Sequence, residues 1–247
     1  MDFLDLKDIS EQSMELINPT SIEKVLFVGT ILNLKIGQRI MDFGCGFGEM
    51  LALWGEAYGI GGVGIDIRPY ACQRARQKML DKKLSDRITI LYGSGSEYQY
   101  EPNAFDVAVS LGSTFIWGGF GATIRAMSNV IHKQVELVIG EPYWLSDHIP
   151  PAYRLQEKDV LSEIELLQIA HKEGFDIEYI VRASQDDWDR YECSNWQGLL
   201  RWIEANPTHP ERQQVIDHLH QSEDEYMRYS RQYFGWAIYI LNPIGYK

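Results

Sequence analysis

Three glycines at alternate positions form the part of this sequence that is best suited to bind a ligand. Gly44, Gly46 and Gly48 follow an apolar stretch over 39–43 and precede apolar residues at helical spacing over 49–58. Glycine turns the chain sharply and leaves no Cβ between backbone and ligand. A helix start offers unpaired N–H groups and a positive dipole end, which favour a carboxylate or phosphate. The pattern predicts a strand–turn–helix unit that binds a nucleotide-like ligand, with a tight turn that binds nothing as the alternative.

The spacing of these glycines departs from that of dinucleotide-binding turns. Those turns favour G-x-G-x-x-G/A. Here Glu49 occupies the slot of the third Gly or Ala, Gly48 comes one residue earlier, and Asp42 stands just before the first glycine of the motif. A nicotinamide or flavin fold therefore remains only as an alternative.

A second acidic residue strengthens the prediction of a nucleotide-like ligand. Asp66 lies at the C-terminal end of the next predicted strand, 62–67, and 24 residues beyond Asp42. An acid at this place can accept hydrogen bonds from ribose hydroxyls, and Ile67 would then lie on the adenine face. The alternative for Asp66 is to cap the following helix.

Strand-like and helix-like segments alternate along nearly the whole chain, which predicts an α/β fold with a doubly wound, Rossmann-like sheet. The expected strands cover 39–43, 62–67, 87–92, 104–111, 135–140, 175–181 and 234–241. The expected helices include 10–17, 20–34, 159–172 and 211–233. We expect one domain, 1–247, made of an N-terminal helical cap (1–36), a cofactor-binding core (37–182), a helical insertion or lid (183–233) and a final strand (234–247).

Composition excludes several classes of function. The chain has 247 residues and a formal net charge of −12, which disfavours nucleic acid because a phosphate backbone needs a basic surface. Its densest basic segment, 74–83, is typical of the solvated face of a helix. The longest apolar stretch, 25–34, is far shorter than the roughly 20 residues that cross a membrane.

The ends and the cysteines favour a cytoplasmic protein. The acidic start of the chain is unlike a signal peptide. Cys45, Cys72 and Cys193 fit neither a zinc site nor a disulfide framework, so we expect reduced thiols and no metal. The sequence leaves the oligomeric state open, with a homodimer as one option.

Several motifs occur in the order found in one enzyme family. The D-x-G-x-G-x-G motif at 42–48, Gly64-Ile65-Asp66 and Phe105-Asp106-Val107 together resemble the class I S-adenosylmethionine-dependent methyltransferases. Further strings at 140–144, 188–192, 201–207 and 233–236 resemble the YjhP-like bacterial subgroup of small-molecule methyltransferases.

The resemblance implies a fold, a cofactor and roles for individual residues. It implies a seven-stranded sheet of order 3-2-1-4-5-7-6 with an antiparallel last strand, and an N-terminal cap over S-adenosyl-L-methionine, which leaves as S-adenosyl-L-homocysteine. Asp42 would hold the amino group of the cofactor and Asp66 its ribose. The other expected cofactor contacts are Gly44, Gly46 and Gly48 at the methionine and ribose, Ile67 and Gly95 at the adenine, Ser94 in a slot where many members carry an acid, and Leu111 near the sulfur.

Aromatic residues gather where the resemblance places the methyl acceptor. The expected acceptor-binding residues are Trp117, Tyr143, Trp144 and Trp188, and the candidate catalytic residues are Glu141, His148 and Tyr191. Glu141 is the main candidate for a base or for pairing with a cationic amine, and a loop cap is its alternative. His148 is the rival base, with a solvated side chain as its alternative.

The expected reaction is in-line transfer of the sulfonium methyl to a small molecule, such as an amine or an aromatic compound. Alignment of the nucleophile, methyl and sulfur would supply much of the acceleration. Two alternatives remain: a methyltransferase that acts on protein or RNA, and a non-catalytic or NAD-binding Rossmann protein.

Overall fold

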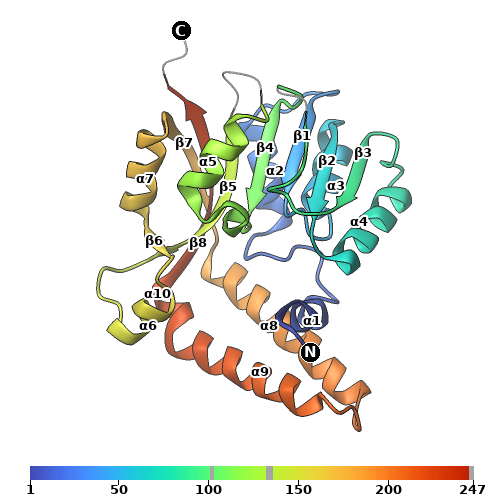
Figure 1. Ribbon diagram of the computed structural model, residues 1–247, viewed down its shortest axis with the longest axis vertical. Helices are drawn as coiled ribbons and strands as arrows, with labels where there is room; N and C mark the ends of the chain where they lie inside the picture. The colour runs from blue at the N-terminus through green and yellow to red at the C-terminus, as the bar shows by residue number, and fades with distance from the viewer. Residues whose placement is uncertain (101–102, 132–135, 245–247) are drawn as a thin grey trace.

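The computed structural model describes residues 1–100, 103–131 and 136–244 and shows a sheet with helices on both faces and a further helical layer at one edge (Figure 1). The strands are β1 (Arg39–Phe43), β2 (Gly61–Asp66), β3 (Ile88–Tyr92), β4 (Val107–Leu111), β5 (Leu137–Trp144), β6 (Leu161–Ser162), β7 (Phe175–Arg182) and β8 (Phe234–Pro243). Their order is β3-β2-β1-β4-β5-β8-β7, with β6 paired to β5. Because β8 runs antiparallel to β5 and β7, the predicted order and the antiparallel last strand are confirmed; the two-residue β6 was not predicted.

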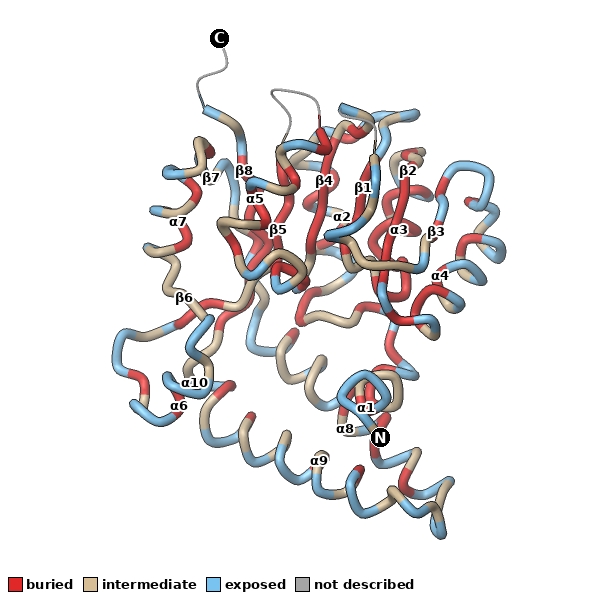
Figure 2. Tube along the Cα trace, in the orientation of Figure 1, coloured by how far each residue is buried: buried red, intermediate tan, exposed pale blue. Residues whose placement is uncertain are grey.

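The sheet is buried on both faces, which explains why its strands are almost continuously apolar. The first face packs on α2 (Ile22–Ile31), α3 (Glu49–Tyr58) and α4 (Pro69–Asp81), and the second on α5 (Phe120–Ser128) and α7 (Glu163–Lys172). Side chains alternate between the two faces: in β1, Ile40 packs in the first cluster, and Met41 and Phe43 pack in the second. Figure 2 shows the central strands buried over most of their length, whereas the edge strands β3 and β7 are partly exposed.

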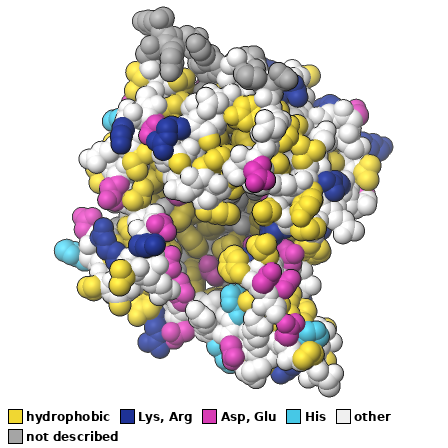
Figure 3. Space-filling view, in the orientation of Figure 1, with side chains coloured by type: hydrophobic (Ala, Val, Ile, Leu, Met, Phe, Trp, Pro, Cys, Tyr) yellow, Lys and Arg dark blue, Asp and Glu magenta, His cyan; other side chains and the backbone are white. Residues whose placement is uncertain are grey.

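A third layer lies beyond the carboxyl ends of the parallel strands (Figure 1). It consists of α1 (Phe3–Ser10), α8 (Gln185–Ala205) and α9 (Arg212–Glu225). The N-terminus and the insertion share a small core of buried side chains: Leu6, Leu199, Ile203, Val215 and Leu219. We call α1, α8 and α9 the helical layer. On the face shown in Figure 3, a hollow with many hydrophobic side chains separates this layer from the sheet.

The N-terminal helices begin and end at other residues than the sequence predicts. A capping box between Asp2 and Asp5 starts α1 at Phe3, and α1 ends at Ser10. The helix expected over 10–17 is therefore wrong, and residues 11–18 cross the carboxyl edge of the sheet without regular structure. Ser21 caps α2, which runs over Ile22–Ile31 rather than over the expected 20–34.

Other element boundaries also differ from the prediction. A capping box between Ser162 and Glu165 starts α7 at Glu163 rather than at 159. The helix expected over 211–233 is divided into α9, the π-helix η2 (Tyr226–Ser230) and α10 (Arg231–Tyr233). β5 continues to Trp144 because it pairs with β8 along its whole length. The remaining elements are η1 (Thr114–Trp117) and α6 (Pro151–Gln156). No helix in the described parts of the chain is both long and apolar enough to cross a membrane.

Candidate functional site

A cavity of about 580 Å³ lies between the carboxyl ends of β1, β2 and β4 on one side and α1 with residues 11–18 on the other. This volume is typical of a site for a small molecule or cofactor. Its wall is mostly apolar, with a few acidic and basic groups. The cavity occupies the edge where open α/β sheets place their ligands.

The three glycines of the turn after β1 all have backbone conformations that side chains disfavour. Their φ angles are +73° at Gly44, +54° at Gly46 and +69° at Gly48. A Cβ on Gly44 would stand 2.6 Å from the Cβ of Ser113, and a Cβ on Gly46 would stand 2.4 Å from the Cδ1 of Ile17. The missing side chains therefore make room for protein neighbours as well as permitting the turn.

Asp42 is a buried acid at the end of β1, and it lines the cavity. Within the described residues, no group donates a hydrogen bond to its carboxylate. Burial raises the pKa of Asp42 to about 8, and the nearby charge of Asp66 adds to the effect. A buried carboxylate is costly when it has no partner. Asp42 is thus suited to a ligand with a cationic group.

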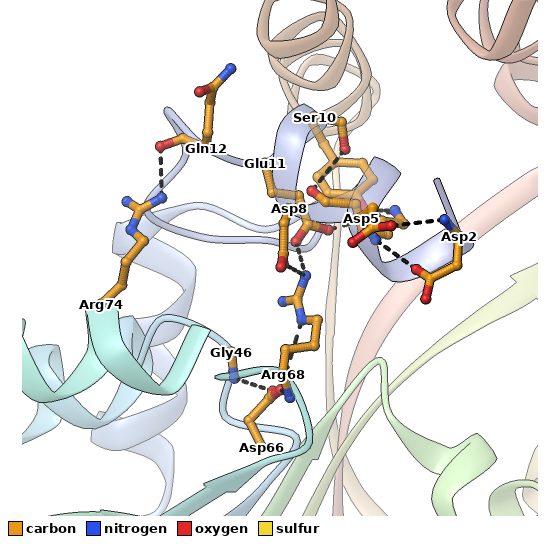
Figure 4. A network of polar contacts seen from close by, with 12 residues as sticks. Asp2, Asp5, Asp8, Ser10, Glu11, Gln12, Gly46, Asp66, Arg68 and Arg74 are labelled. Carbon is orange, nitrogen blue, oxygen red and sulfur yellow. Dashed lines mark hydrogen bonds and ion pairs between the residues drawn. The ribbon is translucent and has the colours of Figure 1, made fainter. Parts of the chain in front are cut away.

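Asp66 lies at the end of β2 and is held from both sides (Figure 4). Its Oδ2 accepts a hydrogen bond from the backbone N–H of Gly46, and its Oδ1 accepts one from the backbone N–H of Arg68, both at 2.9 Å. The N-cap of α4 is Arg68, so Asp66 is not the cap residue. Each carboxylate oxygen keeps a lone pair for another donor. The fixed carboxylate can therefore accept hydrogen bonds from vicinal hydroxyls.

The other predicted cofactor residues lie around the same cavity. Gly44, Ile67, Ser94, Gly95 and Leu111 line it, together with Asp42 and Asp66. Gly46 and Gly48 do not line it, because they face Ile17 and α4. Ser94 shares a 2.8 Å hydrogen bond with Ser96. The cavity thus combines an acidic part, formed by Asp42 and Asp66, with an uncharged part formed by the other predicted residues.

The predicted acceptor-binding aromatics lie in packed parts of the protein instead of on the cavity wall. Trp117 packs edge-on against Phe43, with ring centroids 4.9 Å apart. Tyr143 and Trp144 are buried because β5 extends through them. Trp188 packs against the first core cluster, and its Nε1 is buried with no hydrogen-bond partner among the residues that the structure describes.

The three candidate catalytic residues lie in different surroundings. Tyr191 of α8 lines the cavity, whereas Glu141 and His148 do not. The hydroxyl of Thr114 donates to the carboxylate of the half-buried Glu141, with its Oγ1 at 3.0 and 2.9 Å from the two carboxylate oxygens. Burial raises the pKa of Glu141 to about 7. His148 is exposed in the loop after β5.

Tyr191 lies beside Lys7, a cavity residue that the sequence did not indicate. The Nζ of Lys7 is 3.4 Å from the Oη of Tyr191 and 3.6 Å from a carboxylate oxygen of Glu11. Burial raises the pKa of Tyr191, although Lys7 opposes the effect. The phenol is therefore neutral at physiological pH, and it can orient a ligand through a hydrogen bond.

Sequence reasoning missed the whole N-terminal part of the cavity wall. Its residues are Phe3, Leu4, Lys7, Glu11, Glu15, Leu16, Ile17 and Asn18, and further unpredicted lining residues, among them Phe47, Arg68 and Phe115, come from the core. The acid pair Asp2 and Asp5, three residues apart, was the sequence signal that could have placed α1 correctly. Among the described residues, no group of three or more His, Cys, Asp or Glu side chains is arranged to bind a metal.

Comparison with known proteins gives consistent matches. A methyltransferase-domain family matches residues 40–134. The uncharacterized protein YjhP of Escherichia coli is 32% identical over 98% of this chain and 99% of its own length. The crystal structures of S-adenosylmethionine-dependent methyltransferases from Thiobacillus denitrificans and Geobacter sulfurreducens, both in complex with S-adenosyl-L-homocysteine, are 30% and 33% identical, each with a TM-score of 0.91. Each match covers 98% of this chain, and 100% and 99% of the respective relative.

Proposed function

Since this chain belongs to the S-adenosylmethionine-dependent methyltransferases, we propose that its acceptor is a small molecule, bound in the same cavity as the cofactor. One observation carries the proposal: α1, α8 and residues 11–18 supply one wall of the cavity whose opposite wall is the sheet edge. A covered cavity of this size suits a small acceptor better than a folded protein or an RNA. The net charge of −12 also disfavours RNA.

The sheet edge would hold the cofactor through residues that suit each of its parts. The carboxylate of Asp42, which has no protein donor among the described residues, would accept the ammonium group. Asp66 would accept the ribose hydroxyls, and Gly44 would lie along the methionine part. Ile67, Ser94 and Gly95 would border the adenine, and Leu111 the sulfur. When bound, the cofactor supplies an electrophilic methyl group on a sulfonium centre.

The helical layer would hold the acceptor. Phe3, Leu4 and Phe115 provide apolar surface to the cavity, and Tyr191 and Lys7 provide its polar contacts on that side. The neutral phenol of Tyr191 would orient the acceptor by a hydrogen bond. Apolar walls exclude water from the reacting atoms. This lining supports an aromatic or otherwise apolar acceptor with a hydrogen-bonding substituent.

An amine is the second candidate acceptor, and Glu141 is the observation that favours it. Its carboxylate is half-buried and pairs with the hydroxyl of Thr114 and with no described cation. It would attract an ammonium group and take up its proton. Glu141 lies outside the lining of the cavity, so this candidate requires an acceptor that reaches beyond η1.

A labelling experiment tests the proposal. The protein is incubated with a metabolite extract and S-adenosylmethionine that carries a deuterated methyl group, and mass spectrometry then searches for labelled products. The Asp42→Asn variant is the matched control, because it should lose labelling without losing its fold. A labelled small molecule is the expected result. Label found only in protein or RNA added in parallel reactions contradicts the proposal.

A further inference from the structure

Basic side chains of α4 hold the N-terminal segment across the cavity. We call residues 8–18 the strap. The guanidinium of Arg74 donates hydrogen bonds to the backbone carbonyls of Gln12, at 2.7 Å, and Met14, at 3.0 Å. Lys78 pairs with Glu15. The basic segment that looked like a solvated helix face therefore binds the strap in this structure.

The strap lies directly on the cofactor turn. Ile17 occupies the space beside Gly46, where a Cβ would come within 2.4 Å of its Cδ1. Five strap residues line the cavity: Glu11, Glu15, Leu16, Ile17 and Asn18. A molecule in the cavity would therefore lie against the strap.

Arg68 connects the strap to the floor of the cavity (Figure 4). Its Nη1 is 2.7 Å from Glu11 and 3.3 Å from Asp8 of the strap. Its Nε is 3.7 Å from Oδ1 of Asp66, which also accepts the backbone N–H of Arg68. The residue is only 8% exposed. One buried guanidinium thus lies among three carboxylates, two from the strap and one from the sheet edge.

We propose that Arg68 is a positioning residue that couples Asp66 to the strap and so controls how fast the cofactor enters and leaves. The proposal rests on the proposed cofactor site. Buried charges are tolerated when they are paired. With the strap closed, Arg68 neutralises Glu11 and Asp8 while it holds Asp66 in place; with the strap open, Glu11 and Asp8 lose this partner. Loss of Arg68 removes this preference for the closed strap, and the methyl-transfer step itself does not involve it.

Dissociation of S-adenosyl-L-homocysteine tests this role. Stopped-flow fluorescence measures the dissociation rate for wild type, Arg68→Gln, Glu11→Gln, the double variant and Arg68→Lys. Lys82→Gln is the matched control, because Lys82, the residue just after α4, pairs with Glu56 of α3 and with no residue of the strap among the described ion pairs. Steady-state assays with the acceptor found by labelling give KM for S-adenosylmethionine and kcat for each variant.

We expect Arg68→Gln and Glu11→Gln each to speed dissociation and to raise KM by about tenfold, the loss of one charged hydrogen bond. The double variant should be no faster than the Arg68 variant, Arg68→Lys should recover most of the effect, and kcat should stay within about twofold. Lys82→Gln should match wild type.

Wild-type dissociation rates in both Glu11→Gln and Arg68→Gln overturn the proposal. So do additive effects in the double variant, or a fall in kcat with KM unchanged. If Arg68→Gln does not fold, Glu11→Gln and Arg68→Lys decide the question. A wild-type protein that does not bind S-adenosyl-L-homocysteine would instead contradict the cofactor site itself.

Discussion

Ile17 lies directly over Gly46, with its Cδ1 only 2.4 Å from the point that a Cβ on that glycine would occupy. The N-terminal segment and the glycine turn after β1 are therefore packed against each other. The middle glycine of the motif is required by this contact and by its φ of +54°.

Replacing Gly46 with Ala should destabilise the protein and weaken cofactor binding. The left-handed backbone alone costs roughly 1–2 kcal/mol for alanine, and the clash with Ile17 adds to it. Urea unfolding measures the free energy of unfolding, and calorimetry measures the affinity for S-adenosyl-L-homocysteine. The Gly46→Ala, Ile17→Ala double variant should recover the part due to the clash, relative to Ile17→Ala alone. Wild-type stability in Gly46→Ala would contradict the packing described here.

Binding of S-adenosyl-L-homocysteine should release a proton from Asp42. In the ligand-free protein the pKa of Asp42 is raised to about 8 from an ordinary value of 3.8. The folded state therefore retains a proton that the unfolded chain has lost, so the stability of the free protein falls as pH rises from about 4 to about 8. A cationic ligand favours the ionised form of Asp42. Below pH 8, the affinity for S-adenosyl-L-homocysteine should therefore increase with pH, by up to about tenfold per pH unit.

Calorimetry in two buffers of different ionisation enthalpy detects this proton. The apparent binding enthalpies should differ for wild type and agree for Asp42→Asn, which has no proton to release. Equal enthalpies for wild type in both buffers would show that Asp42 does not change its charge on binding.

Replacing Asp66 with Ala should weaken binding of S-adenosyl-L-homocysteine by roughly 1–3 kcal/mol through the lost hydrogen bonds. Because Asp66 also accepts the N–H groups of Gly46 and Arg68, the variant should be less stable as well. Asp66→Asn is the control that keeps the shape and part of the hydrogen bonding. Unchanged affinity in Asp66→Ala, measured by calorimetry, rules out the proposed ribose contact.

Replacing Tyr191 with Phe should affect the acceptor and leave the cofactor unaffected. The change removes the phenol that lies 3.4 Å from Lys7 and keeps the aromatic ring. We expect kcat/KM for the acceptor to fall about tenfold, the effect of one hydrogen bond, with the affinity for S-adenosyl-L-homocysteine unchanged. Tyr179→Phe removes a phenol from the exposed face of β7 and serves as the control. A loss of cofactor affinity instead would place Tyr191 at the cofactor.

The Thr114–Glu141 pair gives a test of the amine alternative. Burial raises the pKa of Glu141, and the hydrogen bond from the Thr114 hydroxyl partly opposes that effect. Thr114→Val removes this hydroxyl, so the pKa of Glu141 should rise above about 7. If Glu141 acts on the acceptor in its ionised form, the acidic limb of the pH–rate profile should move to higher pH. Thr114→Ser keeps the hydroxyl and should keep the wild-type profile. Identical profiles in wild type and Thr114→Val exclude this role.

The acceptor side shows why sequence reasoning about the site was incomplete. Tyr143 and Trp144 looked like residues of a ligand-facing loop because the apolar run of the fifth strand ends at Gly140. Pairing with β8 continues the strand through both residues and buries them. β8 is nearly a hundred residues away in sequence, so no local pattern around Gly140 reveals this pairing.

The sequence by itself determined the alternation of strands and helices, the glycine turn after β1 and the acid at the end of β2, whereas the expected order of the strands came from the resemblance to a known family. Glycine spacing, strand periodicity and the place of Asp66 after an apolar run depend on neighbours within one strand or helix, and local chemistry decides them. The tertiary structure alone decided which side chains of the N-terminal segment face the cavity. Lys7 and Tyr191 meet there because α1 and α8 pack together, and Arg68 reaches the strap because residues 8–18 lie across α4. Such contacts depend on how distant segments pack, which the periodicity of no single segment contains.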